Sequence, residues 1–555
     1  LYYNLSGGDQ NVAVGYQAGY NHTTGDNNVF VGHYAGSNNT TGYSNIAIGA
    51  LSLDAVTTGG QNTAVGHEAL STCTTFNQTA VGYQALRNLT TAVGCTAVGK
   101  QAGGNNITSS GNNNTLIGHT AGYYVGSASN TVVGANALYQ ATNGGNNVAI
   151  GANASYTTSF GTTCSYNVAV GSEALYTMGT GSNNNIGIGY QSLYDINGGE
   201  NNVAVGHQAG ENITSGDGNV AIGYEAGSAI TSSSNAVYVG YQAGQKSTAT
   251  SNVGIGYQAL GNSSSNDGAY NVAIGYFCLG GITTGSNNIA MGQSAGSSLT
   301  TGSDNILIGD LAGRRITGSS NTALGDNALT GVFGATNDGD ENTALGHDAG
   351  MSITEGGSNT IVGSQTAASL TTGNNNTILG RAAGYSVTTG ANNTFVGSDA
   401  GGGGFNTGTN NTTIGYAAYT ATTSATNSVT LGNSSISSLR CNVQTISSLS
   451  DARDKSDVET LPDATDFIKA LNPVSFTWNQ RDGGRKGIED HGFIAQELLT
   501  AQEETGYSVP DLVSEANPDK LEAAYGRLLP SLVSVIQQQQ QTIEILEARI
   551  SALES

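Results

Sequence analysis

One short unit recurs through most of this chain: an asparagine, two apolar residues separated by a third residue, and a closing glycine. Its first copy is Asn11-Val12-Ala13-Val14-Gly15, and further copies occupy residues 45–49, 147–151, 202–206, 271–275, 305–309 and 393–397. The closing glycine occurs 25 times between Gly15 and Gly432, and 14 of the 24 spacings are 17 residues, the others 16 to 21. A period of this length with β-branched residues and turn signals predicts a parallel β-solenoid with one copy in each coil.

The order of residues within a copy predicts how each coil is built. Because side chains alternate along a strand, we expect Val12 and Val14 on one face and Ala13 on the other. The paired Val/Ile positions are predicted to stack into the core, and the small middle residue to let another backbone approach. The closing glycine suits a tight turn or a positive φ, and the asparagine suits a bond to its own turn or a ladder with the next coil. With strands ~4.8 Å apart, 25 coils predict a rod of roughly 120 Å.

This repeat resembles the head of trimeric autotransporter adhesins and the repeats of phage tail-fibre proteins. The resemblance covers residues 1–435 and implies a left-handed parallel β-roll that assembles as a homotrimer. The usual repeat of that family is shorter than 17 residues, so we expect longer outer turns here.

Composition excludes several classes of function. The formal net charge is -23, which argues against sequence-independent binding to nucleic acid or to an anionic membrane. No apolar run reaches the ~20 residues that span a bilayer. The five cysteines are scattered without a C-x-x-C pair, so we expect no disulfide framework and no zinc site. No calcium-binding repeat is present, and we expect no cofactor and no metal.

A receptor or substrate site, if the rod carries one, is expected on the outer turns where the spacing is longest. These insertions span residues 138–146, 154–165, 261–270 and 330–341. The last contains Asp338, Asp340 and Glu341, and paired carboxylates are what a glycosidase needs. A solvated acidic loop is the favoured interpretation of this cluster.

The chain changes character near Arg440. Residues 1–440 carry 27 charged side chains and residues 441–555 carry 28, and all five prolines and the single tryptophan lie in the second part. Four blocks at residues 449–455, 470–478, 491–498 and 524–532 read LSDARDK, ALNPVSFTW, HGFIAQEL and AYGRLLPSL. Together and in this order they resemble the intramolecular chaperone domain first recognised in endosialidase tailspikes, over residues 446–555.

This resemblance implies that the chain cuts itself beside Ser450, with Ser450 as nucleophile and Lys455 as general base. A serine hydroxyl needs an adjacent base, and a lysine serves when burial makes its neutral form accessible. The resemblance favours the Leu449–Ser450 bond and leaves Ser450–Asp451 open, and it implies that Asp451 and Arg453 orient the site. The alternative is a serine-rich linker. His491 and Glu497 are interpreted as structural, with Ile494 and Leu498 on the core face of one helix.

The C-terminal segment has the spacing of a coiled coil. Apolar residues alternate at intervals of three and four, with one polar exception: Leu529, Leu532, Ile536, Gln539, Ile543, Leu546, Ile550 and Leu553. Ile at a with Leu at d is typical of dimers, whereas the resemblance implies a trimer. The sequence thus predicts a mainly β protein: a β-roll over 1–435, a linker over 436–449, a small α+β chaperone domain over 450–527 and a coiled coil over 528–555.

The resemblances point to a trimeric tail-fibre-like appendage of a virion that attaches to a host. Its expected partners are two further copies of the chain, a host cell-surface glycan or protein, and the virion tail or baseplate, but neither nucleic acid nor membrane. We expect assembly in the host cytoplasm and residence in the virion. The alternatives are a bacterial surface adhesin, a glycan-degrading tailspike and a membrane-tethered transcription factor. The lack of an apolar span and the acidic charge argue against the last.

Overall fold

The computed structural model describes residues 7–105, 111–140, 143–157, 163–261, 266–335, 337–404, 407–420, 422–436, 438–440, 450–479, 486–515, 519 and 521–555. These form two compact units, residues 1–364 and 365–555. The first contains strands β1 to β23, and the second contains β24 to β27 and the C-terminal domain.

The solenoid is made of strands that are only two or three residues long. They are β1 (Val12–Val14), β2 (Val29–Val31), β3 (Ile46–Ile48), β4 (Thr63–Val65), β5 (Thr79–Val81), β6 (Thr96–Val98), β7 (Thr115–Ile117), β8 (Thr131–Val133), β9 (Val148–Ile150), β10 (Val168–Val170), β11 (Thr177–Met178), β12 (Ile186–Ile188), β13 (Asp195–Ile196), β14 (Val203–Val205), β15 (Val220–Ile222), β16 (Val237–Val239), β17 (Val253–Ile255), β18 (Val272–Ile274), β19 (Ile289–Met291), β20 (Ile306–Ile308), β21 (Thr322–Leu324), β22 (Thr343–Leu345), β23 (Thr360–Val362), β24 (Thr377–Leu379), β25 (Thr394–Val396), β26 (Thr412–Ile414) and β27 (Val429–Leu431).

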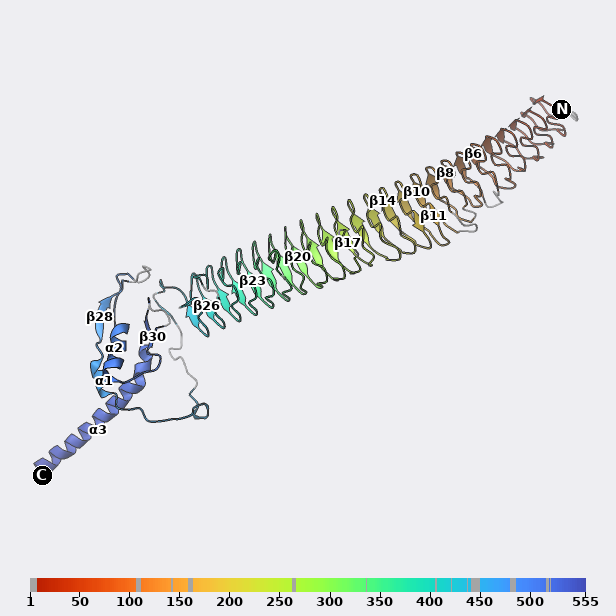
Figure 1. Ribbon diagram of the computed structural model, residues 1–555. Coiled ribbons are helices and arrows are strands. Elements are labelled where there is room, and N and C mark those ends of the chain that lie inside the picture. The colour runs from red at the N-terminus through yellow and green to blue at the C-terminus, as the bar shows by residue number, and fades with distance from the viewer. Residues whose placement is uncertain are drawn as a thin grey trace. The chain divides into compact units, whose positions relative to one another are not determined.

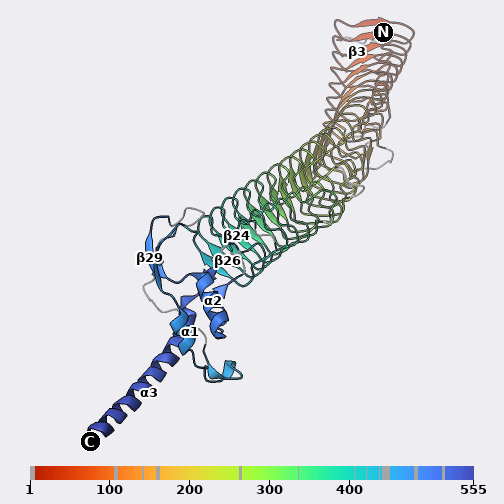
Figure 2. The ribbon, with the colours of Figure 1, turned by 60° about the vertical axis from the view of Figure 1, so that its left-hand side comes forward.

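Successive strands pair in parallel and in register, one strand for each copy of the repeat. Val12, Ala13 and Val14 of β1 lie opposite Val29, Phe30 and Val31 of β2, and the same alignment continues to β23. In the first unit the strands lie in one row along the stack of coils (Figure 1, Figure 2). The strands β11 and β13 form a second, two-stranded parallel pair. The prediction of a parallel β-solenoid with one coil for each copy is confirmed.

The predicted direction of the strand side chains is wrong. In every strand from β2 to β23 except the short β11 and β13, the middle residue is buried and its two neighbours are more exposed. In β3, Ala47 is fully buried, whereas Ile46 and Ile48 are 38% and 40% exposed. Each three-residue strand therefore directs one side chain into the coil, and in many coils that residue is alanine. Where the middle residue is large, a glycine lies against it, because a Cβ on Gly36 would be only 2.4 Å from the Phe30 ring.

The asparagine and the glycine of the repeat have the predicted roles. The buried Asn45 donates its backbone N–H to the Asn28 side chain at 2.9 Å, and its own Oδ1 accepts from Asn62 N at 3.1 Å. Its Nδ2 donates to the carbonyl of Gly59 in the following turn at 2.9 Å. The closing Gly32 has φ 141°, and a Cβ there would lie 2.5 Å from the carbonyl oxygen of Gly49. The ladder and the close backbone approach together define the register between coils.

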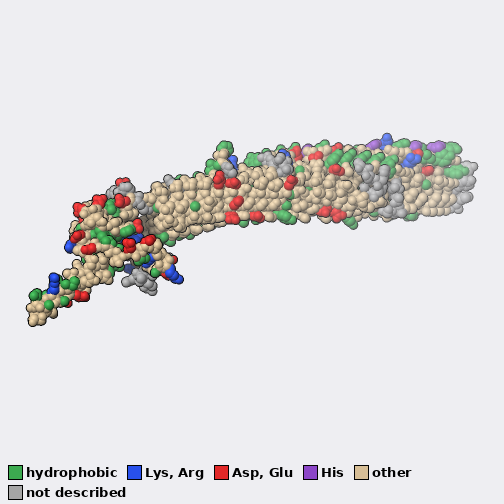
Figure 3. All heavy atoms as spheres, turned by 60° about the horizontal axis from the view of Figure 1, so that its bottom comes forward, with side chains coloured by type: hydrophobic (Ala, Val, Ile, Leu, Met, Phe, Trp, Pro, Cys, Tyr) green, Lys and Arg blue, Asp and Glu red, His purple; other side chains and the backbone are tan. Residues whose placement is uncertain are grey.

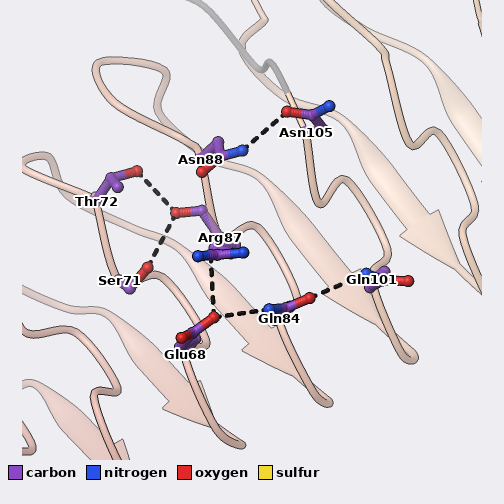
Figure 4. A network of polar contacts seen from close by, with 8 residues as sticks. All are labelled: Glu68, Ser71, Thr72, Gln84, Arg87, Asn88, Gln101 and Asn105. Carbon is purple, nitrogen blue, oxygen red and sulfur yellow. Dashed lines mark hydrogen bonds and ion pairs between the residues drawn. The ribbon is translucent and has the colours of Figure 1, made fainter.

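Side chains on the outer turns also connect neighbouring coils, as Figure 4 shows for the turns that follow Gly66, Gly82 and Gly99. Gln101 donates to Gln84 at 2.9 Å, and Gln84 donates to Glu68 at 2.7 Å. Glu68 also forms an ion pair with Arg87 at 3.0 Å. Each turn is thus held by its neighbours through polar side chains as well as through the backbone.

The C-terminal domain is a small α+β unit. Its elements are η1 (Ala452–Asp454), α1 (Thr465–Ala470), β28 (Val474–Thr477), β29 (Glu489–Gly492), α2 (Ala495–Thr505), β30 (Val513–Ser514), β31 (Glu522–Ala523), η2 (Tyr525–Leu528) and α3 (Leu529–Glu554). The pairs β28–β29 and β30–β31 are antiparallel, and α1 packs against α2 and α3 (Figure 2). The core contains Phe467 stacked on Tyr507, with Leu498, Leu528 and Val535 around them. The predicted α+β domain ending in a long helix is confirmed.

Candidate self-cleavage site

Ser450 and Lys455, five residues apart in sequence, are in direct contact. The Nζ of Lys455 lies 2.6 Å from the Oγ of Ser450 and 3.5 Å from the Ser450 carbonyl oxygen. The contact is made possible by η1, a single 3-10 turn, because the backbone N–H of Lys455 closes that turn on the carbonyl of Ala452. The chain therefore folds back on itself within six residues, as a nucleophile and its base require.

Asp451 and Arg453 hold this turn. Asp451 is the N-cap of η1 and accepts the backbone N–H of Arg453 at 2.9 Å. Its carboxylate also pairs with the Arg453 guanidinium, with Nη2 at 2.5 Å and Nε at 3.0 Å. These bonds lower the pKa of the Asp451 carboxyl, which therefore stays ionised at neutral pH. Both motif residues thus fix the backbone between Ser450 and Lys455.

The site is open to solvent in the single chain. Ser450 and Lys455 are both exposed, and Leu449, the residue on the other side of the favoured scissile bond, lies outside the described residues. A lysine becomes an effective base through burial, and water around the pair weakens any electrostatic activation. The fold brings the two candidate side chains into contact but leaves both exposed to solvent.

The other candidate residues have structural surroundings. The Oδ1 of Asp340 accepts the backbone N–H of Ser319, and Glu341 accepts from Ser358 at 2.9 Å, so these carboxylates bridge neighbouring coils. Together with the exposure of Asp338, this favours the solvated acidic loop over a paired-carboxylate site. Glu497 accepts from Asn472 at 3.2 Å.

The prediction that Ile494 lies on the core face of a helix is wrong. Ile494 is the N-cap residue of α2, where the backbone is still extended, and it is 37% exposed, whereas Leu498 is buried as predicted.

Neither the cysteines nor the acidic residues form another chemical centre in the described part of the chain. Burial raises the pKa of the Cys278 thiol to about 12, which keeps it protonated and unreactive. Cys73 and Cys95 are also buried, with raised pKa values, and Cys441 lies outside the described residues. Within the described ranges, no group of three or more His, Cys, Asp or Glu could hold a metal ion. None of the helices described has the length and apolar character that crossing a membrane requires.

Comparison with known proteins identifies the C-terminal segment. Residues 450–507 match the family model described as chaperone of endosialidase. The match begins at Ser450 and contains η1, α1, the β28–β29 hairpin and α2. No curated protein and no solved structure matches the chain. A β-solenoid followed by this segment fits a tail-fibre-like protein with a C-terminal chaperone domain, and the family is one of self-cleaving chaperones.

Proposed function

We propose that this chain, with its endosialidase-type chaperone segment after a long β-solenoid, is a homotrimeric tail-fibre-like appendage of a virion. In this proposal the solenoid attaches to a host surface glycan or protein, and the C-terminal domain directs folding and then releases itself. Assembly takes place in the host cytoplasm, and the rod joins the virion tail or baseplate. The observation that carries the proposal is the family match that starts at Ser450, where Lys455 contacts the serine hydroxyl.

Self-association is supported by an apolar stripe along the first unit. We define the stripe as the third residues of the three-residue strands in this unit. The following members are more than a third exposed: Val14, Ile48, Val81, Val98, Ile117, Ile150, Ile188, Ile222, Ile255, Met291, Leu324 and Leu345. Contiguous apolar surface of this extent is rare on monomeric proteins. A second copy carries an identical stripe with an identical period, so copies of the chain are the partners that match it best.

The helix α3 supports the same conclusion. Ser531 and Val535 face the C-terminal domain, and Thr465 donates to Gln538 at 3.2 Å on that side. The predicted heptad seam is on the exposed side, with Ile536 61% and Ile550 54% exposed. An exposed Leu/Ile seam on a 26-residue helix is stabilised when it packs against the same seam of other copies. Three copies rather than two follow from the resemblance of the repeats to trimeric adhesin heads.

In the proposed reaction, Lys455 takes the proton of the Ser450 hydroxyl, and Oγ attacks the carbonyl carbon of Leu449. The peptide C–N bond breaks, the α-amino group of Ser450 takes a proton, and the acyl group is left as an ester on Oγ. Water then hydrolyses the ester and releases the carboxylate of Leu449. Because Ser450 and Lys455 are exposed in one chain, we expect cleavage only after other copies cover the site.

The test is a denaturing gel with intact-mass measurement on the purified full chain. Wild type is expected to give fragments of 449 and 106 residues, and Ser450→Ala and Lys455→Ala are expected to stay whole. Ser448→Ala is the matched control, since it removes a neighbouring serine of the same segment and should be cut normally. A wild-type assembly that stays uncut, or a Ser450→Ala variant that is cut, would refute the dyad.

A further inference from the structure

Five tyrosines at equivalent positions of successive coils stack into a column. Each lies five residues after a closing glycine, as Tyr156 does after Gly151. The members of this tyrosine column are Tyr123, Tyr139, Tyr156, Tyr176 and Tyr194. Their ring centroids are 5.4, 5.2, 5.3 and 5.0 Å apart, and neighbouring planes are within 8° of parallel. The column therefore continues for roughly 20 Å along the coils, at the rung spacing of a parallel sheet.

The coil itself does not need tyrosine at this position. The equivalent residue is Asp54 in an earlier coil, Arg87 in the network of Figure 4, and Glu211 in the coil after Tyr194. The five rings pack mainly on one another and remain partly exposed. Because small and charged residues occupy the same position elsewhere, the run of five rings is not explained by the requirements of the fold.

The column is separate from the apolar stripe that we assign to self-association. Between Ile150 of the stripe and Tyr156, the chain turns through the positive-φ residues Asn153 and Ser155 and buries Ala154. Copies that associate through the stripe can therefore leave the tyrosines accessible. In the described part of the chain, no protein group forms a hydrogen bond with the hydroxyl of any of the five.

The charge around the column excludes anionic ligands. From Gln101 to Gln245 the sequence contains no lysine and no arginine. The space-filling view of Figure 3 shows acidic and hydrophobic side chains over the middle of the solenoid and few basic ones. Burial, together with the charges of Glu173 and Asp195, raises the pKa of Tyr194. Nucleic acids and acidic polysaccharides need basic side chains, so the ligand is uncharged or cationic.

We propose that the tyrosine column binds a neutral linear glycan that lies along the coils. A site that repeats at each coil suits a ligand that repeats along its own length. Because neighbouring rings cover one another's faces, a sugar would meet the ring edges in van der Waals contact, and the unused hydroxyls would donate to and accept from sugar hydroxyls. A protein partner does not need this translational repeat. The proposal rests on the proposed host-attachment function and names the chemical class of the receptor.

The experiment uses the full-length assembled protein and an array of neutral linear hexasaccharides of glucose, mannose and N-acetylglucosamine, with sialylated glycans beside them. Affinities of the glycans retained are then measured by calorimetry. Wild type should retain at least one neutral glycan and no sialylated one. The double variant Tyr156→Ser/Tyr176→Ser should bind that glycan roughly tenfold or more weakly, since two rings and two hydroxyls are lost. The double variant Tyr156→Phe/Tyr176→Phe should lose only part of the affinity.

The matched control is Tyr241→Ser/Tyr257→Ser, which removes two rings from another stack whose centroids are 5.2 Å apart. It should bind as wild type does, and sedimentation should give all variants the same assembly size. The proposal is overturned if wild type retains no neutral glycan, if the Tyr156/Tyr176 variants bind normally, or if the control loses as much affinity. Adsorption of wild-type protein to a panel of bacterial cells separates the two claims. Adsorption that survives the serine substitutions refutes the column alone, whereas no adsorption by wild type refutes host attachment.

Discussion

Replacing one asparagine of the buried ladder measures how much the ladder stabilises each coil. Asn202 is fully buried, and its Oδ1 accepts the backbone N–H of Asn219 at 2.9 Å. Its Nδ2 donates to the carbonyl of Gly216 at 2.8 Å. Asn202→Ala leaves both of these backbone groups buried without those partners. At about 1–3 kcal/mol for each unsatisfied buried group, the coil should lose about 2–6 kcal/mol of local stability.

Because coils of a solenoid open locally, hydrogen exchange read by mass spectrometry is the appropriate assay. Peptides that cover residues 202–219 should exchange at least tenfold faster in Asn202→Ala, whereas peptides from distant coils should not change. Asn212→Ala is the control: this side chain is exposed, donates once, to Ser228 O at 2.7 Å, and should cost less than about 1 kcal/mol. Equal effects of the two substitutions would refute the argument that buried amides hold the register.

Three further predictions test the inward side chains, the helix and the cleavage turn. Ala204 is fully buried in the coil, so Ala204→Leu overfills the space around it and should destabilise the solenoid by about 1–3 kcal/mol or more in thermal unfolding. Ile222→Ser, on the stripe, should leave the fold of the single chain intact but weaken assembly in light scattering. Ile543→Asp places a charge in the exposed seam of α3 and should reduce the assembly to monomers in light scattering. Asp451→Asn removes the ion pair with Arg453 and should slow self-cleavage severalfold on a timed gel. The lowered pKa of Asp451 means that this pair stabilises the turn above the ordinary carboxyl pKa of 3.8 and is lost as the pH falls below it.

Each of these has a result that contradicts it. If the Ala204→Leu variant is as stable as wild type, the middle residue of the strand does not face a tightly packed core. Gln541→Asp, on an exposed position of α3 outside the seam, is the control for Ile543→Asp, and equal dissociation of both variants would argue against the seam. Cleavage by Asp451→Asn at the wild-type rate would remove Asp451 from the site.

The repeat predicts the architecture because its period, its glycine and its asparagine are each tied to backbone geometry. Gly32 cannot carry a Cβ next to the Gly49 carbonyl, and Asn45 forms hydrogen bonds to the preceding and the following coil at once. The direction of the side chains could not be predicted in the same way. Alternation puts Val12 and Ala13 on opposite faces but does not say which face is inside. Hydrophobicity favours valine in the core, and that preference cannot decide here because the outer face of the strands is itself apolar.

The contact between Ser450 and Lys455 could be predicted from the motif, but the exposure of the two side chains could not. The spacing of Ser450 and Lys455 requires a turn, and η1 provides it through the cap at Asp451. The exposure of the pair is a property of the single chain and has no signature in the sequence. The tyrosine column does have one, a tyrosine five residues after the closing glycine in five successive copies, which is recognisable only once the coil is known.

The uniformity of the stripe explains why such a rod would need a separate domain to align its copies. Its third residues are almost all Ile, Val or Leu, so a shift of one chain by one coil buries nearly the same apolar surface. In the proposed assembly, the stripe would therefore hold the copies together but would not determine the register between them. The seam of α3 is not uniform, because Gln539 interrupts a run of Leu and Ile, and a polar residue in a seam favours the one alignment that pairs it with itself. Once the rods are aligned and joined along their whole length, that information is no longer needed. A domain that sets the register can then be removed without loss of stability, and after its removal the chains could not separate and realign.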